Sequence, residues 1–339
     1  MDPSSRLAGL LFATAAIAFG QSTHPVANVF DPQATPADSV YRVSMLMLAV
    51  CAAIFLVVGG LLAFTVVRFR RRKKDNSREP AQVYGSNQIE IAWTVIPILI
   101  VLVLSMATAR AVVEVQNKRQ PTDALKVTVI GHQWWWEFRY PELGIVTANE
   151  LHVPVSTSAK PALTFLKLES ADVAHSFWVP QLAGKTDLIP GITNTMWVDP
   201  RLEGIFLGNC AEYCGTQHAN MLLRVIVESP EDFKKWAAAQ KLGAAADPRL
   251  ESARATFLSL SCINCHTVSG TTAKGTFGPD LTHLMSRANL GSSVVPNTPV
   301  NLRAWMKNPQ AVKPGNLMPN MQLNSRELDE IVMYLSSLK

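Results

Sequence analysis

The sequence predicts a multidomain membrane protein with a two-helix transmembrane hairpin, a β-sandwich and an all-α domain, in that order. Two long uncharged apolar runs lie near the start of the chain, and the middle region alternates short β-rich segments with Gly and Pro clusters. The last ninety or so residues have helical sequence with turns rich in Gly and Pro. At 339 residues, the chain is long enough for two or three domains.

Residues 1–20 have the pattern of a secretory signal peptide. Arg6 precedes an apolar stretch from Leu7 to Phe19, and polar residues follow it. This apolar stretch is too short to span a bilayer. We therefore expect a signal peptide here, and the alternative is a hydrophobic N-terminus that the protein retains.

A transmembrane hairpin is expected over residues 40–113. The runs Val43–Val67 and Ile91–Ala109 contain no charged residue, and each is long enough to cross a bilayer. The predicted helices cover about residues 42–68 and 89–112.

The basic segment between the two runs predicts the topology of the hairpin. Seven Lys and Arg residues lie between Arg68 and Arg78, and such loops face the cytoplasm. Everything after residue 113 is then periplasmic or extracellular, on a multi-pass protein of the cell inner (plasma) membrane. The formal net charge of +5 is explained by this loop, so no nucleic-acid partner is expected.

Short runs rich in β-branched and aromatic residues predict a β-sandwich over residues 120–228. Gly and Pro clusters separate these runs, as is typical of sandwiches. The predicted strands are Leu125–Ile130, Trp134–Tyr140, Ala162–Leu168, Ser176–Val179, Thr195–Val198 and Leu222–Val227.

A helical linker is predicted over residues 229–248, before an all-α domain at 249–339. The linker starts with Ser229-Pro-Glu-Asp232, which places Pro in the first turn and acids at the positive end of the helix dipole. Ala-rich sequence then continues to Asp247-Pro248.

A cluster of soft ligands predicts a copper site in the β-rich region. Cys210, Cys214, His218 and Met221 lie within twelve residues, and His175 lies upstream. Thiolate, thioether and imidazole together favour copper over calcium or magnesium. A disulfide between the two cysteines explains neither the histidine nor the methionine, and a single blue-copper centre needs only one cysteine.

The C-terminal region contains a haem attachment motif. Cys262-Ile-Asn-Cys265-His266 has the C-x-x-C-H pattern, in which two thiols bond the haem and the histidine reaches the iron. A distant thioether usually supplies the second axial ligand. Met318 is the preferred candidate and Met321 is its rival, while a zinc or redox cysteine pair is the alternative for the motif itself.

Together these motifs resemble a known family. Cys210–Met221, Asp172–Trp178, Gly131–Trp136 and Val179–Gly191 are similar to the CuA signature of cytochrome c oxidase subunit II, over residues 40–228. The C-terminal region resembles a class I cytochrome c. The resemblance implies that the sandwich is cupredoxin-like and that the all-α domain is a cytochrome c domain.

The resemblance also implies the cofactors. A binuclear copper A centre and a covalently bound haem c are expected, and magnesium shared with subunit I would bind the side chain of Glu212. Copper ligands carried over by position are His175, Cys210, Cys214, His218, Met221 and the backbone carbonyl of Glu212, and the haem ligands are Cys262, Cys265, His266 and Met318.

Two further residues receive roles from the resemblance. Trp134 would lie on the electron route into CuA, whereas Trp135 and Trp136 are interpreted as aromatic residues of an ordinary core strand. Glu90 would lie at the entrance of a proton-uptake channel in subunit I. Because Asn87 and Glu90 have the spacing of a helix capping box, a purely structural role for Glu90 is the alternative.

The expected function is that of subunit II of a respiratory cytochrome c oxidase. Electrons would arrive through haem c, pass to CuA and continue to subunit I, which reduces oxygen to water coupled to proton translocation. Expected partners are subunits I and III, an upstream cytochrome or copper-protein donor, and membrane lipid. The alternative is a membrane-anchored electron-transfer cupredoxin and cytochrome without oxidase activity.

Overall fold

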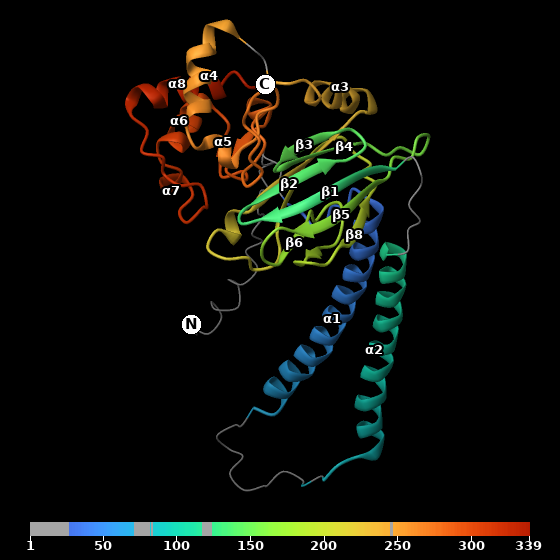
Figure 1. Ribbon diagram of the computed structural model, residues 1–339. Coiled ribbons are helices and arrows are strands. Elements are labelled where there is room, and N and C mark those ends of the chain that lie inside the picture. The colour runs from blue at the N-terminus through green and yellow to red at the C-terminus, as the bar shows by residue number, and fades with distance from the viewer. Residues whose placement is uncertain (1–26, 71–81, 83, 117–123, 245–246) are drawn as a thin grey trace, which may run out of the picture.

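The protein has a helical hairpin, a β-sandwich and a helical C-terminal domain, as Figure 1 shows for the computed structural model. The structure describes residues 27–70, 82, 84–116, 124–244 and 247–339. The predicted signal peptide and most of the basic segment lie outside the described residues.

The hairpin consists of α1 (Thr35–Arg68) and α2 (Asn87–Gln116), both long and apolar enough to cross a membrane. Their apolar side chains are exposed: Phe55 is 75 % accessible and Val67 is 78 % accessible. Apolar surface of this extent needs lipid or another apolar partner. The predicted pair of long apolar helices is therefore confirmed, and their exposed surface is that expected of a membrane anchor.

Both helices are tied to the sandwich at the same end. The backbone N–H and the hydroxyl of Thr35 donate to the two carboxylate oxygens of Asp199, at 2.8 and 2.6 Å. The indole N–H of Trp197 donates to the carbonyl of Val115 at 2.6 Å. The hairpin therefore extends away from the sandwich in one direction (Figure 1).

Two five-stranded sheets form the sandwich. In spatial order, the first contains β3 (Ile145–Ala148), β2 (Trp135–Tyr140), β1 (Leu125–His132), β5 (Thr164–Ser170) and β8 (Asn194–Val198). The second contains β4 (Glu150–Pro154), β10 (Leu222–Glu228), β9 (Gly204–Cys210), β6 (His175–Trp178) and β7 (Thr186–Leu188). All six predicted strands are present, and β3, β4, β7 and β9 were not predicted.

The sandwich core lies between the two sheets. Along β10, buried and half-buried residues alternate, as expected when one face of a strand packs inward. Trp136 and Phe177, from opposite sheets, are fully buried and meet edge to face, with ring centroids 5.5 Å apart. This close packing gives the loops at the sandwich end a rigid base.

The linker begins with α3 (Pro230–Gln240). The Ser229 side chain accepts a hydrogen bond from the backbone N–H of Asp232 at 3.1 Å, which caps the helix as its sequence predicts. Trp236 stacks on His152 of β4 with ring centroids 4.2 Å apart. The linker helix is thus packed on the sandwich at this point.

The C-terminal domain is helical apart from one small hairpin. Its core is built around α4 and α8, where Phe257 and Tyr334 pack with ring centroids 5.4 Å apart. It lies on the side of the sandwich away from the membrane hairpin (Figure 1). Its elements are α4 (Glu251–Ser259), α5 (Cys262–Cys265), α6 (Pro299–Lys307), α7 (Pro309–Val312), α8 (Ser325–Leu335), β11 (Asn289–Leu290) and β12 (Val295–Pro296).

Candidate copper and haem sites

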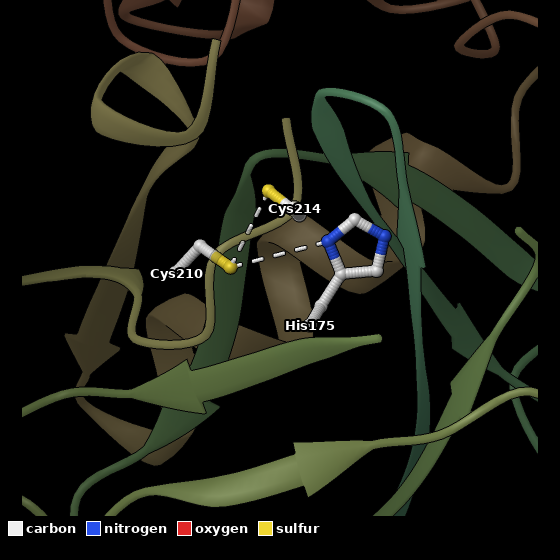
Figure 2. Close-up of side chains that lie close together, drawn as sticks. All are labelled: His175, Cys210 and Cys214. Carbon is white, nitrogen blue, oxygen red and sulfur yellow. Dashed lines mark hydrogen bonds between the residues drawn. The ribbon is translucent and has the colours of Figure 1, made fainter. Parts of the chain in front are cut away.

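Six donor atoms converge at one end of the sandwich. His175 begins β6 and Cys210 ends β9, so neighbouring strands deliver both side chains to the same place. Cys214, His218 and Met221 lie on the loop from β9 to β10. Figure 2 shows His175, Cys210 and Cys214 facing one another.

The two cysteine sulfurs are at the centre of this cluster, 3.8 Å apart, which is too far for a disulfide. Each of the other donor atoms lies beside one of them. Cys210 Sγ is 3.9 Å from His175 Nδ1 and 3.1 Å from Glu212 O, and Cys214 Sγ is 3.6 Å from His218 Nδ1 and 3.8 Å from Met221 Sδ.

This donor set fits copper. His175, Cys210, Cys214 and Met221 are each at most 3 % exposed, and paired thiols with imidazoles and a thioether suit copper. The hydrogen bond between the thiols lowers the pKa of Cys210 and raises that of Cys214, because one proton is shared between two close sulfurs. A bound cation would replace that proton and hold both thiolates.

Neighbouring residues fix the orientation of His175. Asp172 Oδ1 lies 2.8 Å from His175 Nε2, so the other ring nitrogen, Nδ1, faces Cys210. Asp172 also accepts the backbone N–H of Gln133 at 2.7 Å. At Gly131, a Cβ atom would lie 2.7 Å from the His175 ring, so only glycine fits there. The sequence analysis named Asp172 only as the first residue of the Asp172–Trp178 motif. Its carboxylate contact with His175 was not predicted.

The haem attachment motif opens into a cavity whose lining has the donors and apolar side chains that a haem needs. Cys262, Cys265, His266 and Met318 all line it, together with apolar side chains. His266 Nδ1 donates to the carbonyl of Pro279 at 2.7 Å, which leaves Nε2 available as an iron ligand. Burial lowers the pKa of His266 and so favours the neutral ring that binds metals.

Gly278 packs directly against the His266 ring, where no side chain would fit. A Cβ atom at Gly278 would lie 2.6 Å from the imidazole Cε1, closer than two carbon atoms can approach. Because glycine has no Cβ, the backbone at position 278 can contact the ring and so helps to fix the orientation of His266.

Met318 is held by two hydrogen-bond donors. The indole N–H of Trp305 points at Met318 Sδ from 3.2 Å, and the Gln310 amide donates to the Met318 carbonyl at 2.8 Å. Met321 lines the same cavity. Selection of Met318 as the axial ligand therefore stays a prediction.

Trp134 joins the two sites. Its indole N–H donates to the carbonyl of Cys214 at 3.0 Å, and the amide of Gln133 donates to the same oxygen at 2.7 Å. Trp134 is also one of the residues that line the haem cavity. One buried aromatic residue is therefore in contact with the copper loop and with the wall of the haem cavity.

The neighbouring tryptophans differ from each other. Trp136 is fully buried in the sandwich core, as predicted. The prediction for Trp135 was wrong: it is half-buried, stacks on His132 at 4.2 Å and lines the haem cavity. Alternation along β2 places Trp135 on the outer face, where the C-terminal domain covers it.

Glu212 and Glu90 are both exposed. The Glu212 backbone carbonyl faces Cys210, while its side chain belongs to an exposed residue at the surface of the copper loop. Glu90 lies in the first turn of α2. Asn87 is the first helical residue of α2, whereas a capping residue directly precedes the first helical residue. Asn87 and Glu90 therefore do not occupy the positions of a capping box.

The fold and the two sites define a membrane-anchored electron-transfer protein that combines a copper-type donor set with a c-type haem site. Three family models match the chain: cytochrome c oxidase subunit II, transmembrane domain, at residues 23–110; its periplasmic domain at 149–229; and cytochrome c at 250–339.

Relatives match over nearly the whole chain. Cytochrome c oxidase subunit 2 of Alkalihalophilus pseudofirmus is 32 % identical, covering 92 % of this chain and 91 % of the relative. The same subunit of Bacillus sp. (strain PS3) is 32 % identical, covering 97 % and 96 %. The crystal structure of the periplasmic domain of subunit II of cytochrome oxidase of Bradyrhizobium japonicum is 29 % identical, covering 36 % of this chain and 96 % of that one, with a TM-score of 0.33.

The chain therefore belongs to the cytochrome c oxidase subunit 2 family and carries a C-terminal cytochrome c domain. Membership implies copper in the sandwich and haem c in the last domain. The predictions that this chain is an oxidase subunit and a membrane-anchored protein are confirmed.

Proposed function

We propose that this chain accepts electrons through haem c and passes them by way of a binuclear CuA centre to subunit I. There, oxygen is reduced to water with coupled proton translocation. Bound haem and copper would supply the one-electron chemistry. This chain's own part is to hold both groups at fixed positions and to connect them through protein.

Trp134 is the observation that carries this proposal. Trp134 is one of the residues that line the haem cavity, and its indole N–H donates to the backbone carbonyl of Cys214. An electron leaving the haem cavity therefore has a short path through one buried residue and one hydrogen bond to a copper-ligand residue. We assign Trp134 to the electron route between the sites.

The ligand assignment follows the converging donor atoms. Cys210 and Cys214 would hold the copper centre through their thiolates, because their sulfurs lie at the centre of the cluster. The terminal donors would be His175, His218, Met221 and the carbonyl of Glu212. In the haem domain, Cys262 and Cys265 would bond the haem covalently, with His266 and Met318 as axial ligands.

The partners are those of an oxidase complex. We propose that the exposed carboxylate of Glu212 contributes to a magnesium site shared with subunit I. Subunit III and an upstream cytochrome or copper-protein donor complete the proposed set. The anchor would lie in the cell inner (plasma) membrane, with residues 120–228 and 249–339 outside it, joined by the linker at 229–248.

Co-purification tests this function against a free membrane-anchored electron carrier. We expect the full chain, extracted in mild detergent, to bring down a large many-helix subunit with its own haem and copper centres. The preparation should consume oxygen when an electron donor is supplied. If the chain is isolated in its native membranes without such a subunit, yet carries haem and copper, the alternative of a carrier without oxidase activity is correct.

Glu90→Gln tests the proposed proton-uptake role. We expect assembly and copper reduction to remain normal while oxygen turnover falls roughly tenfold, since an amide cannot carry a proton. Gln keeps the size and polarity of Glu at this helix start, so a purely structural role predicts little change. Steady-state oxygen consumption by the assembled complex measures the difference.

Glu114→Gln is the matched control, at the opposite end of α2. Its carboxylate pairs with Arg42 at 3.2 Å on an exposed surface, and such pairs contribute little stability. Turnover should stay at the wild-type level. Equal turnover in Glu90→Gln and the wild type would leave helix support as the role of Glu90.

A further inference from the structure

Lys313 is a buried lysine between the copper domain and the haem domain. It lies directly after α7 and is 2 % exposed. Its Nζ donates to three backbone carbonyls: Trp134 at 2.8 Å, Asn220 at 2.9 Å and Gly291 at 2.9 Å. Two of these acceptors belong to the copper domain, and the third belongs to the haem domain.

The contacts of Lys313 use its full hydrogen-bonding capacity. An ammonium group has three N–H donors, and each of the three here has its own carbonyl. Burial opposes the charged form of Lys313 and lowers its pKa, while the three carbonyls that accept from Nζ stabilise the ammonium. A buried ammonium is tolerated only when its donors are satisfied, and here the interface between domains satisfies them.

The position of the acceptors connects Lys313 to both sites. Trp134 contacts the copper loop and the haem cavity, while Asn220 directly precedes Met221 in the copper donor set. Lys313 itself starts the segment that leads to Met318. One side chain therefore ties the methionine segment of the haem site to the backbone of the copper site.

Three further hydrogen bonds join the two domains, each between a single donor and a single acceptor. The Gln217 amide donates to Pro314 O at 2.6 Å, the Ser292 hydroxyl donates to Leu222 O at 2.6 Å, and the Ala288 N–H donates to Glu150 Oε1 at 2.8 Å. Loss of Lys313 would leave two copper-domain carbonyls without their donor, which costs more than the loss of an exposed contact.

We propose that Lys313 is a positioning residue that holds the haem domain on the copper domain, with Trp134 fixed between the two sites. Without it, the interface opens more often, and in the open state the short path through Trp134 is lost. The docking part of this inference does not depend on the proposed function. Its consequence for electron transfer does.

Hydrogen exchange in the Lys313→Met variant of the full chain tests the docking. Met fills similar volume but donates no hydrogen bond. The amide of Ala288 is the reporter, because its N–H is bonded across the interface to Glu150. We expect this amide to exchange at least roughly tenfold faster than in the wild type, a change of about 1.4 kcal/mol in the opening equilibrium.

Two controls separate docking from general destabilisation. Lys307→Met removes an exposed lysine of the same domain and should leave exchange at Ala288 unchanged. Ile331, in the core of α8, should exchange at the wild-type rate in both variants. Equal exchange at Ala288 in Lys313→Met and wild type overturns the proposal, and so does faster exchange at Ala288 and Ile331 together.

Lys313→Gln covers the case in which the methionine variant does not accumulate. Glutamine retains two N–H donors without the charge, so the interface should open less often than with methionine but more often than in the wild type. Wild-type exchange at Ala288 in Lys313→Gln would also overturn the proposal.

Flash reduction of the haem gives a second readout. Reduction by the external reductant should occur at the wild-type rate in Lys313→Met, while transfer onward to copper slows in proportion to the open fraction. Faster exchange with unchanged transfer would show that Lys313 docks the domains but that the electron route does not depend on docking. Normal docking with no onward transfer in the wild type would instead count against the proposed function.

Discussion

Replacing Cys214 by serine is expected to abolish the binuclear copper centre. Its sulfur lies close to three other donors, Cys210 Sγ at 3.8 Å, His218 Nδ1 at 3.6 Å and Met221 Sδ at 3.8 Å. A serine hydroxyl is a hard ligand that stays protonated near neutral pH, so it cannot bridge two copper ions. The mixed-valence EPR signal should disappear, and copper content should fall by elemental analysis.

The fold should survive this substitution. Trp134 and Gln133 donate to the backbone carbonyl of Cys214, not to its sulfur, so both contacts are kept. Cys51→Ser is the matched control, because Cys51 is exposed on α1. That variant should show the full copper signal. Copper loading in Cys214→Ser equal to that of Cys51→Ser would refute the copper assignment.

Most of the copper site could be predicted because its donors are close in sequence. Four side-chain donors and the Glu212 carbonyl fall from Cys210 to Met221, and soft side chains at such spacing have few other uses. The strand that delivers Cys210 could not be predicted. β9 runs from Gly204 to Cys210 with glycine at two positions, which weakens its β-sheet propensity, and only pairing with β6 and β10 makes it a strand.

Contacts between domains could not be predicted from local sequence patterns. Lys313 looks like a solvated lysine in a polar turn, and nothing near it in the sequence signals that carbonyls of Trp134 and Asn220 would surround it. Trp135 was misjudged for the same reason. It lies on the outer face of the sandwich, where it stacks on His132 and lines a cavity shared with the C-terminal domain.

Replacing Met318 by alanine is expected to lower the reduction potential of the haem and to open its iron to external ligands. A thioether ligand favours reduced iron, so its loss favours the oxidised form. In this structure Met318 lines the haem cavity, and its sulfur faces the indole N–H of Trp305 at 3.2 Å. Redox titration of the haem absorbance measures the potential, and added cyanide or carbon monoxide measures access to the iron.

Met321→Ala is the matched control, since Met321 lines the same cavity. The Gln310 amide holds the Met318 backbone through its carbonyl at 2.8 Å and keeps this contact in both variants, so the loop should retain its conformation. The wild-type potential and a closed iron are therefore expected in Met321→Ala. A lowered potential and external ligand binding in Met321→Ala, with neither in Met318→Ala, would show that Met321 is the axial ligand. The Trp305 indole would then hold a methionine that only packs in the cavity wall.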